Sequence, residues 1–264
     1  MSSADVLAVL GGEEPNSETD GGSKVETATA YELLRIDATL WPQIRELIEG
    51  NIRNAPRERQ KAIGPSELGT DCLHCLAAKL AGWPRKRGTA WLPFIGTCVH
   101  EHFERMFAGL NPQGFDPDVR HRPYETEMRV TVRELHGLAG GYPVKGSIDL
   151  YDRASASTVD WKVVGATTLK GVKAHGPSQT YMVQASLYGI GLMNAGEKVE
   201  RNCIFFLPRN GISLNDALPV ELRFSDKPGL WAMARAQMLV TVLDLIEQQD
   251  GPDVRDAWIH LLPV

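Results

Sequence analysis

The sequence predicts an α/β fold, with a mixed central sheet of about five strands flanked by helices. Segments with apolar residues at helical spacing and segments of alternating or β-branched residues follow one another in the order helix, three strands, helix, two strands, helix. Three consecutive strands, followed by strands that alternate with helices, favour one sheet with helices packed on its faces. The 264 residues suffice for one large domain, and no sequence feature marks a second one.

Helical periodicity predicts three helices before the strands, over residues 38–52, 65–80 and 94–110. Ser66 is a suitable cap for the second helix. The third has an inward apolar stripe, formed by Ile95, Val99, Phe103, Met106 and Phe107. We expect strands over 124–132, 144–151, 158–164, 201–207 and 220–224, and further helices over 178–192 and 231–247, the last one capped by Ser225 or Asp226.

Charge and composition separate the beginning of the chain from the rest. Residues 1–30 are acidic and poor in large apolar side chains, so we expect a disordered acidic tail followed by a single domain over residues 31–264. Residues 51–88 carry an excess of Lys and Arg, which indicates either a phosphate-binding patch or an ordinary solvated face. No apolar run reaches the length of a membrane span and no signal segment opens the chain, so we expect a cytoplasmic protein with no membrane partner.

Residues 144–164 predict a hairpin that gathers charged side chains on one face. Antiparallel pairing across its polar turn places Asp149 directly opposite Asp160, with Cβ atoms about 5 Å apart. Lys162 lies two residues beyond Asp160 and shares its face, while Trp161 points to the other side. Two carboxylates and an ammonium group are therefore expected to converge.

Facing carboxylates repel each other, which leaves two interpretations. In one, a divalent metal ion between Asp149 and Asp160 resolves the repulsion, as in a site that cuts phosphodiesters. In the other, both face solvent on an edge hairpin and Lys162 is an ordinary surface partner. A one-residue change in the loop would also send the two side chains to opposite faces, so further ligands must decide.

Three residues elsewhere in the chain are candidates for such ligands. His100 lies in the third predicted helix, and Glu104 follows one turn later on the same side. A lone histidine on a helix is more often structural than a ligand. Glu127 is expected near the same end of the sheet, either as a further ligand or as an exposed charge, and we favour a supporting role.

Five motifs follow one another along the chain: Gly96-x3-His100, Glu127, Gly146-x2-Asp149, Asp160-Trp161-Lys162 and Gln184-x3-Tyr188. In this order they resemble the PD-(D/E)XK nucleases, and among these the RecB-type exonucleases, which include the CRISPR-associated four-cysteine exonucleases and their phage-encoded relatives. The match covers roughly residues 64–210. A single D-x10-D-x-K spacing would recur by chance, whereas five ordered motifs are much harder to obtain accidentally. The resemblance implies a restriction-endonuclease-like fold.

The resemblance also implies the chemistry of the site. His100, Asp149 and Asp160 would ligate Mg²⁺ or Mn²⁺, with the backbone carbonyl of Trp161 as a further oxygen donor. Lys162 would position or activate the attacking water. Such ions take hard oxygen ligands, lower the pKa of a bound water and offset charge on the scissile phosphate.

Two further pairs of residues are expected to contact DNA. The resemblance implies that Gln184 and Tyr188 lie along the cleft and help to hold the strand being cut, although Tyr188 equally suits a core position. Lys170 and Lys173 follow the catalytic strand with no acid between them. They suit phosphate contacts from a loop, where exposed lysines without such a role are also common.

These expectations favour a metal-dependent DNA exonuclease that acts on DNA ends or single strands in recombination, repair or phage DNA processing, in a bacterial or phage-infected cytoplasm. One alternative is a structure-selective or restriction-like endonuclease of the same superfamily. Another is a non-catalytic DNA-binding protein on the same fold. The sequence indicates no protein partner, cleavage polarity or oligomeric state.

The four cysteines depart from the iron-sulfur members of this group, which typically place three near the C-terminus. Here Cys72 and Cys75 precede the histidine motif, Cys98 lies beside it, and nothing follows Cys203. We therefore do not expect an iron-sulfur cluster as the cofactor, and a single C-x2-C is a weak signal for zinc. We expect buried, unmodified thiols.

Overall fold

The computed structural model describes residues 40–54, 63–84, 91–112, 122–138 and 140–264. The predicted tail and much of the predicted basic patch lie outside these residues, so both stay predictions. The chain divides into a unit of residues 1–51 and a unit of residues 52–264, which are considered separately. The first contains most of helix α3 (Trp41–Asn54), which matches the helix predicted over 38–52.

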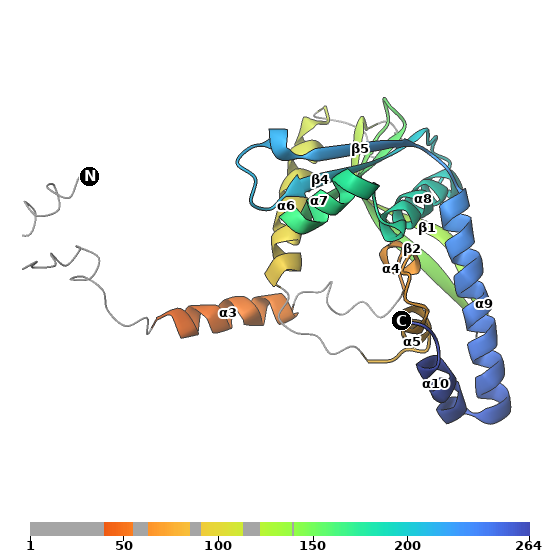
Figure 1. Ribbon diagram of the computed structural model, residues 1–264. Helices are drawn as coiled ribbons and strands as arrows, with labels where there is room; N and C mark the ends of the chain where they lie inside the picture. The colour runs from red at the N-terminus through yellow and green to blue at the C-terminus, as the bar shows by residue number, and fades with distance from the viewer. Residues whose placement is uncertain (1–39, 55–62, 85–90, 113–121, 139) are drawn as a thin grey trace, which may run out of the picture. The chain divides into compact units, whose positions relative to one another are not determined.

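The second unit holds the mixed sheet that the sequence predicts (Figure 1). Its strands are β1 (Tyr124–Gly137), β2 (Gly140–Asp152), β3 (Ser157–Val164), β4 (Arg201–Pro208) and β5 (Leu218–Arg223). Its helices are α4 (Pro65–Leu68), α5 (Leu73–Leu80), α6 (Trp91–Leu110), α7 (Ala166–His175), α8 (Gln179–Asn194), α9 (Lys227–Asp250) and α10 (Pro252–His260), with a short 3-10 helix η2 (Leu214–Asp216). The α/β prediction, with five strands and flanking helices, is confirmed.

The five strands lie in the order β1-β2-β3-β4-β5. All neighbours are antiparallel except β3 and β4, whose parallel pairing is made possible by the crossover through α7 and α8. The predicted hairpin register is confirmed, because Tyr151 pairs with Thr158 and Leu150 with Val159. The ladder between β2 and β3 ends at that second pair, one residue before Asp149.

Helices cover the two faces of the sheet through different sets of side chains. On β4, Ile204 and Phe206 pack with α7 and α8, whereas Cys203 and Phe205 lie on the other face with Phe107 of α6. The largest core cluster joins α8, α9 and β1, and Figure 1 shows α9 running beside β1 before α10 turns back along it. By length and composition α9 would pass as a membrane span, a test that the core helices of soluble proteins also pass.

Several boundaries differ from the prediction for local reasons. The helix expected over 65–80 is two helices, since Gly69 packs so tightly on α8 that a Cβ there would lie 2.7 Å from Thr180 Cα. Ser66 is not its cap: Gly64 is, with its N–H donating to Glu67 Oε2 at 3.2 Å. The strand expected over 124–132 continues to Gly137, because a register irregularity between Thr131 and Arg133 lets pairing with β2 resume.

The predicted inward stripe of α6 is only partly correct. No residue of α6 is fully buried, and Met106 is exposed. The reason is that the helix meets the sheet along a narrow line of aromatic rings, so Ile95 and Val99 are only half-buried. Helices α7 and α10 were not expected from the sequence.

Candidate active site

An aromatic cluster fixes α6 on the sheet and thereby positions His100. The ring of Phe107 stacks on Trp161 of β3 with centroids 5.8 Å apart, and Phe103 meets the same ring edge-on at 5.0 Å. At the end of the helix, the side-chain amide of Asn111 exchanges two hydrogen bonds with the backbone of Tyr124, at 2.9 and 3.1 Å. Residues 100, 103 and 107 share one side of a helix, so His100 is held against the sheet as well.

His100 faces Asp149 at the point where the sheet opens. Its Nδ1 lies 3.3 Å from Asp149 Oδ1, and both side chains are largely buried. The other oxygen of Asp149 accepts a hydrogen bond of 2.9 Å from the backbone N–H of Trp161. The backbone pairing between β2 and β3 has ended at this point, so no carbonyl of β2 pairs with the N–H of Trp161. The Asp149 carboxylate accepts its hydrogen bond instead.

Glu127 completes a group of possible metal ligands with His100 and Asp149. One ligand atom from each of the three lies within 4.8 Å of the other two. Glu127 has a φ of 47°, a left-handed conformation that is uncommon outside glycine and is often found at functional sites. The chain changes faces at this residue: Tyr124 packs with Phe107 before it, and Met128 packs in a cluster with Tyr188 after it.

A second, more deeply buried set of polar side chains lies on the α8 side of the sheet. Lys162 Nζ lies 2.6 Å from Asp160 Oδ2 and donates to Gln184 Oε1 at 3.0 Å. The amide nitrogen of Gln184 in turn donates to Asp160 Oδ1 at 3.3 Å and to the Tyr188 hydroxyl at 2.9 Å. Lys162 also lies 5.4 Å from the ring centroid of Tyr181. The ammonium group is therefore held in place by an acid, an amide and an aromatic face.

The surroundings shift the pKa of three of these groups. Burial raises the pKa of Asp160 to about 6; Lys162 opposes this shift and the charge of Asp149 adds to it. Burial alone would lower the pKa of His100, but its hydrogen bond with Asp149 and the negative charges around it outweigh burial, and the pKa is raised. Burial also raises the pKa of Tyr188, which stays a neutral phenol. Perturbed groups that cluster in this way are typical of functional sites.

The structure brings together most of the predicted site residues. His100 lies beside Asp149, and Lys162 lies beside Asp160 as strand periodicity predicts. The placement of Asp149 directly opposite Asp160 stays a prediction, because the ladder between β2 and β3 ends one residue before Asp149. Glu127 belongs to the candidate ligand group. This position fits a metal ligand better than the expected supporting role. Among the described residues, Asp160 is not part of that group, because it lies against Lys162 and Gln184.

The remaining predicted residues lie at varying distances from this group. Glu104 is half-buried on α6 but is absent from the described ligand group. Gln184 and Tyr188 are 6% and 7% exposed and bond to the polar cluster, so their contact with DNA stays a prediction. The same is true of the Trp161 carbonyl as a ligand. Lys170 and Lys173 are exposed, but the expected loop is wrong: both lie on helix α7.

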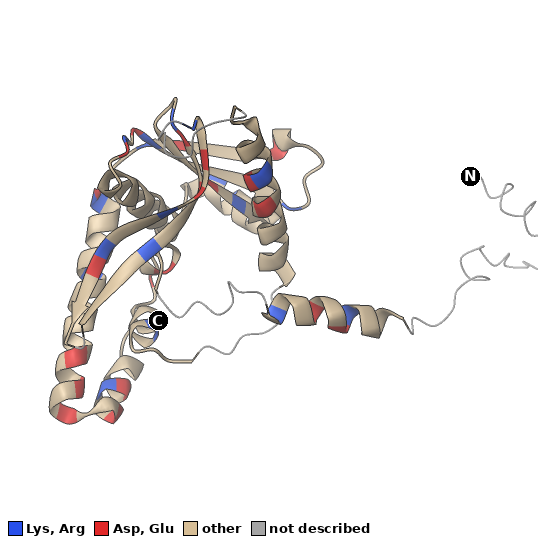
Figure 2. Cartoon of the chain, turned by 180° about the vertical axis from the view of Figure 1, so that it is seen from behind, with Lys and Arg blue, Asp and Glu red and all other residues tan. Residues whose placement is uncertain are grey.

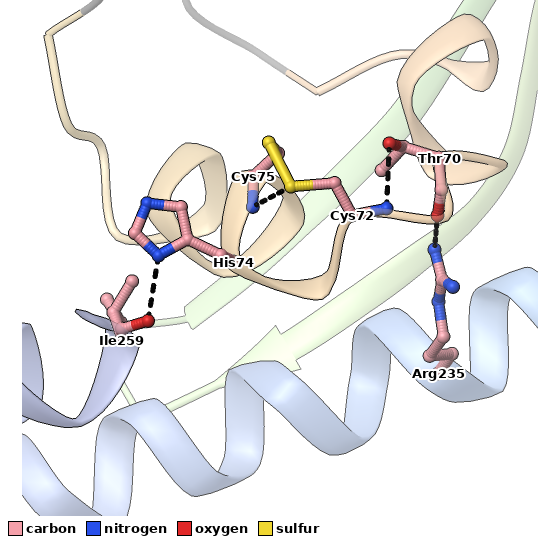
Figure 3. Close-up of a disulfide and its surroundings, with 6 residues drawn as sticks. All are labelled: Thr70, Cys72, His74, Cys75, Arg235 and Ile259. Carbon is pink, nitrogen blue, oxygen red and sulfur yellow. Dashed lines mark hydrogen bonds between the residues drawn. A yellow bond between two sulfur atoms is a disulfide. The ribbon is translucent and has the colours of Figure 1, made fainter. Parts of the chain in front are cut away.

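The expectation of four buried, unmodified thiols is wrong for three of the cysteines. Cys72 and Cys75 form a disulfide at the start of α5 (Figure 3). Cys98 is exposed. Figure 3 shows the backbone N–H of Cys75 donating to the sulfur of Cys72, which is the N-cap of α5. Two cysteines three residues apart can form a disulfide across the first turn of a helix. The C-x2-C spacing alone does not distinguish such a disulfide from two free thiols. Cys203 is buried and free, as expected.

Two supporting side chains were not found from the sequence. The hydroxyl of Ser147 donates to Glu127 Oε2 at 2.7 Å, and so links β2 to the candidate ligand group. Asn202 is buried in β4 and donates to Thr158 Oγ1 and to the carbonyl of Ala185, which fixes α8 against the sheet. A polar residue inside an apolar strand, as in Arg201–Leu207, was the available signal for Asn202.

Comparison with known proteins gives distant likenesses only. No family model and no curated protein matches the chain. Among solved structures, it is similar to an alkaline exonuclease, LHK-Exo, from Laribacter hongkongensis, with a TM-score of 0.46 and 9% identity over 77% of this chain and 92% of that one. It is also similar to a phage-related exonuclease from Haemophilus somnus 129PT, with a TM-score of 0.39 and 9% identity over 71% of this chain and 80% of that one.

Proposed function

We propose that this chain is a Mg²⁺- or Mn²⁺-dependent deoxyribonuclease that hydrolyses phosphodiester bonds, and that it acts as an exonuclease in recombination, repair or phage DNA processing. The observation that carries the proposal is the meeting of His100, Glu127 and Asp149 within 4.8 Å, next to a lysine held by Asp160. Carboxylates and an ammonium group arranged around one point suit the hydrolysis of a phosphate ester. The ordered motifs support the exonuclease mode.

The donor set fits a divalent cation of the hard or borderline class. Two carboxylates offer oxygen ligands and His100 offers a nitrogen, which suits Mn²⁺ well and Mg²⁺ when waters complete its shell. Asp149 is hydrogen-bonded by Trp161 N–H and Glu127 by Ser147, so both carboxylates are oriented before any ion arrives. When bound, the metal would lower the pKa of a water and offset negative charge on the phosphate.

The residues of the buried cluster supply the fixed positive charge. During hydrolysis a water loses a proton as its oxygen bonds to phosphorus, the bond from phosphorus to the leaving oxygen breaks, and the leaving oxygen takes up a proton. Negative charge grows on the phosphoryl oxygens along this path, and Lys162 stabilises it because Asp160 and Gln184 already hold its ammonium group. Gln184 acts through Lys162 and Asp160 and is a positioning residue.

The test uses end-labelled linear DNA and closed circular DNA, incubated with Mg²⁺ or Mn²⁺ or with a chelator. We expect linear DNA to be degraded from its ends only with metal, circular DNA to persist, and the Asp160→Ala and Lys162→Ala variants to be inactive. If circular DNA is cut as readily as linear DNA, the protein is an endonuclease and not an exonuclease. DNA binding without metal-dependent cleavage, or full cleavage by both variants, would overturn the enzyme proposal.

A further inference from the structure

The hairpin of β1 and β2 extends well beyond the rest of the sheet. It is paired from Tyr124–Asp152 to Gly137–Gly140, whereas β2 pairs with β3 at only three positions near its end. One face of this extension is buried: Val130, Val144 and Ile148 pack in clusters with residues of α8 or α9. The side chains at the alternate positions face the other way.

That other face continues directly from the candidate ligand group. Ser147, which donates to Glu127, pairs with Arg129, and the next pair on the same face is Thr131 with Lys145. Arg129, Thr131 and Lys145 are all exposed. At about 3.3 Å per residue, Ser147 lies roughly 7 Å and Lys145 roughly 13 Å along the strand from Asp149.

The two cations on this face have no acidic partner in the part of the chain that the structure describes. Neither Arg129 nor Lys145 takes part in an ion pair within the described ranges. The next acid along this face is Glu134, whose side chain lies over Gly141 beyond the register irregularity. Seen from behind, the two long strands carry both blue segments of Lys and Arg and red segments of Asp and Glu (Figure 2).

We propose that this face, formed by Arg129, Thr131, Lys145 and Ser147, binds the phosphate backbone of the DNA strand that enters the site. The inference rests on the proposed function and specifies the surface of β1 and β2 along which the DNA strand would reach the site. Unpaired cations that follow a strand away from a phosphate-cleaving site are complementary to a polyanion whose charges are regularly spaced. From Asp149 to Lys145 the face is roughly 13 Å long, which equals about four base steps along the axis of duplex DNA at ~3.4 Å per step.

The test measures binding of a fluorescein-labelled 20-nucleotide single strand by fluorescence anisotropy over a range of KCl concentrations. Cleavage is prevented in every protein by the Lys162→Met background, and Mg²⁺ is present throughout. The variants are Arg129→Gln, Lys145→Gln and their combination. We expect the slope of log affinity against log salt to fall by about 0.7 for each cation removed, as for a lost phosphate contact.

Arg133→Gln is the matched control. Arg133 is also an exposed arginine of β1, but it pairs with the buried Val144 and lines the groove against α9 with Met233 and Gln237. Its salt slope should stay at the value of the background protein. The substituted side chains are exposed, so thermal melting should change little in all variants.

Cleavage by the same substitutions in the active background separates the two proposals. Arg129→Gln and Lys145→Gln should raise KM for DNA and leave kcat near that of the unsubstituted protein, because neither cation touches the reacting phosphate. If the protein degrades DNA but both variants bind and cleave like Arg133→Gln, the path is overturned and the nuclease stands. If the protein neither binds nor cleaves DNA, the proposed function fails, and the path fails with it.

Discussion

The two halves of the candidate site differ in how their charges are balanced. On the α6 side, Glu127 and Asp149 converge on one imidazole, so negative charge exceeds positive charge there even when His100 is protonated. On the α8 side, Asp160 has an ammonium group at 2.6 Å and an amide that bonds to both. Among the described residues, the first half therefore has more carboxylates than cations and suits an added cation, whereas the second contains its own ammonium group. Metal affinity and catalytic positioning should therefore be separable by mutation.

The largest expected effect comes from removing one charge from each half. Asp149→Asn and Lys162→Met should each reduce cleavage by at least ~100-fold, since each loses a group that stabilises charge at the phosphate. Only Asp149→Asn should also abolish Mn²⁺ binding in calorimetry, with Arg133→Gln in the groove against α9 as the control for both measurements. Equal loss of Mn²⁺ binding in Lys162→Met would remove the distinction between the halves.

A smaller effect is expected from Gln184→Met. The substitution leaves the buried Asp160 and Lys162 without their shared partner, which should lower kcat about tenfold or more and the free energy of unfolding by about 1–3 kcal/mol. Mn²⁺ affinity should hardly change. Gln237→Met is the matched control, because Gln237 bonds to the backbone of His136 far from the cluster and should affect stability alone. A change in Mn²⁺ affinity as large as that in kcat would show that the two halves are not independent.

The buried half should also set a pH dependence of stability in the metal-free protein. The folded pKa of Asp160 is raised to about 6, so its contribution is present at low pH and is lost as the pH rises from about 4 through 6. The raised pKa of His100 acts in the same direction at somewhat higher pH. Urea unfolding with chelator at pH 5 and pH 8 should show lower stability at pH 8, by roughly 1–2 kcal/mol, because part of the effect of Asp160 is already lost at pH 5. Asp160→Asn should flatten this slope, and an unchanged slope would contradict the assignment to Asp160.

The smallest effect concerns the packing that holds Tyr188 beside Gln184. A Cβ on Gly146 would lie 2.8 Å from Tyr188 Cε1 and 2.9 Å from Pro65 Cγ, so Gly146→Ala should cost about 1–3 kcal/mol of stability. Gly171→Ala on α7, where a Cβ meets nothing within 4 Å, should instead stabilise the protein by up to about 1 kcal/mol. The melting temperatures of the two variants test this prediction. Similar changes in melting temperature for both would show that the glycine beside Tyr188 is not required for close packing.

Much of the fold and half of the site follow from local sequence patterns. The polar turn fixes the register of the hairpin, and strand periodicity then places Lys162 beside Asp160. Helical spacing with Phe103 and Phe107 likewise places His100 on the side of α6 that meets the sheet. These results need only neighbours within one element or one hairpin.

The features that were missed depend on contacts between distant segments or on backbone conformations without a sequence signal. Glu127 joins the ligand group through a positive φ, which nothing in its sequence neighbourhood predicts. Helix α7 contains two threonines and a glycine, which are poor helix formers, and only Leu169 and Val172 are buried. The break at Gly69 arises from its packing on Thr180, over a hundred residues away in the chain.

The hydrogen bond from Trp161 N–H to Asp149 has a consequence for recognising active members of such a group from sequence. Asp149 accepts a hydrogen bond from β3 where the backbone ladder ends. An acceptor at this position therefore stabilises the sheet whether or not the protein is catalytically active. In a related protein that has lost catalysis, we expect Asp149 to be retained and Lys162 to be substituted. Among related chains, the lysine should be the more reliable marker of the proposed nuclease activity, and the aspartate the more reliable marker of the fold.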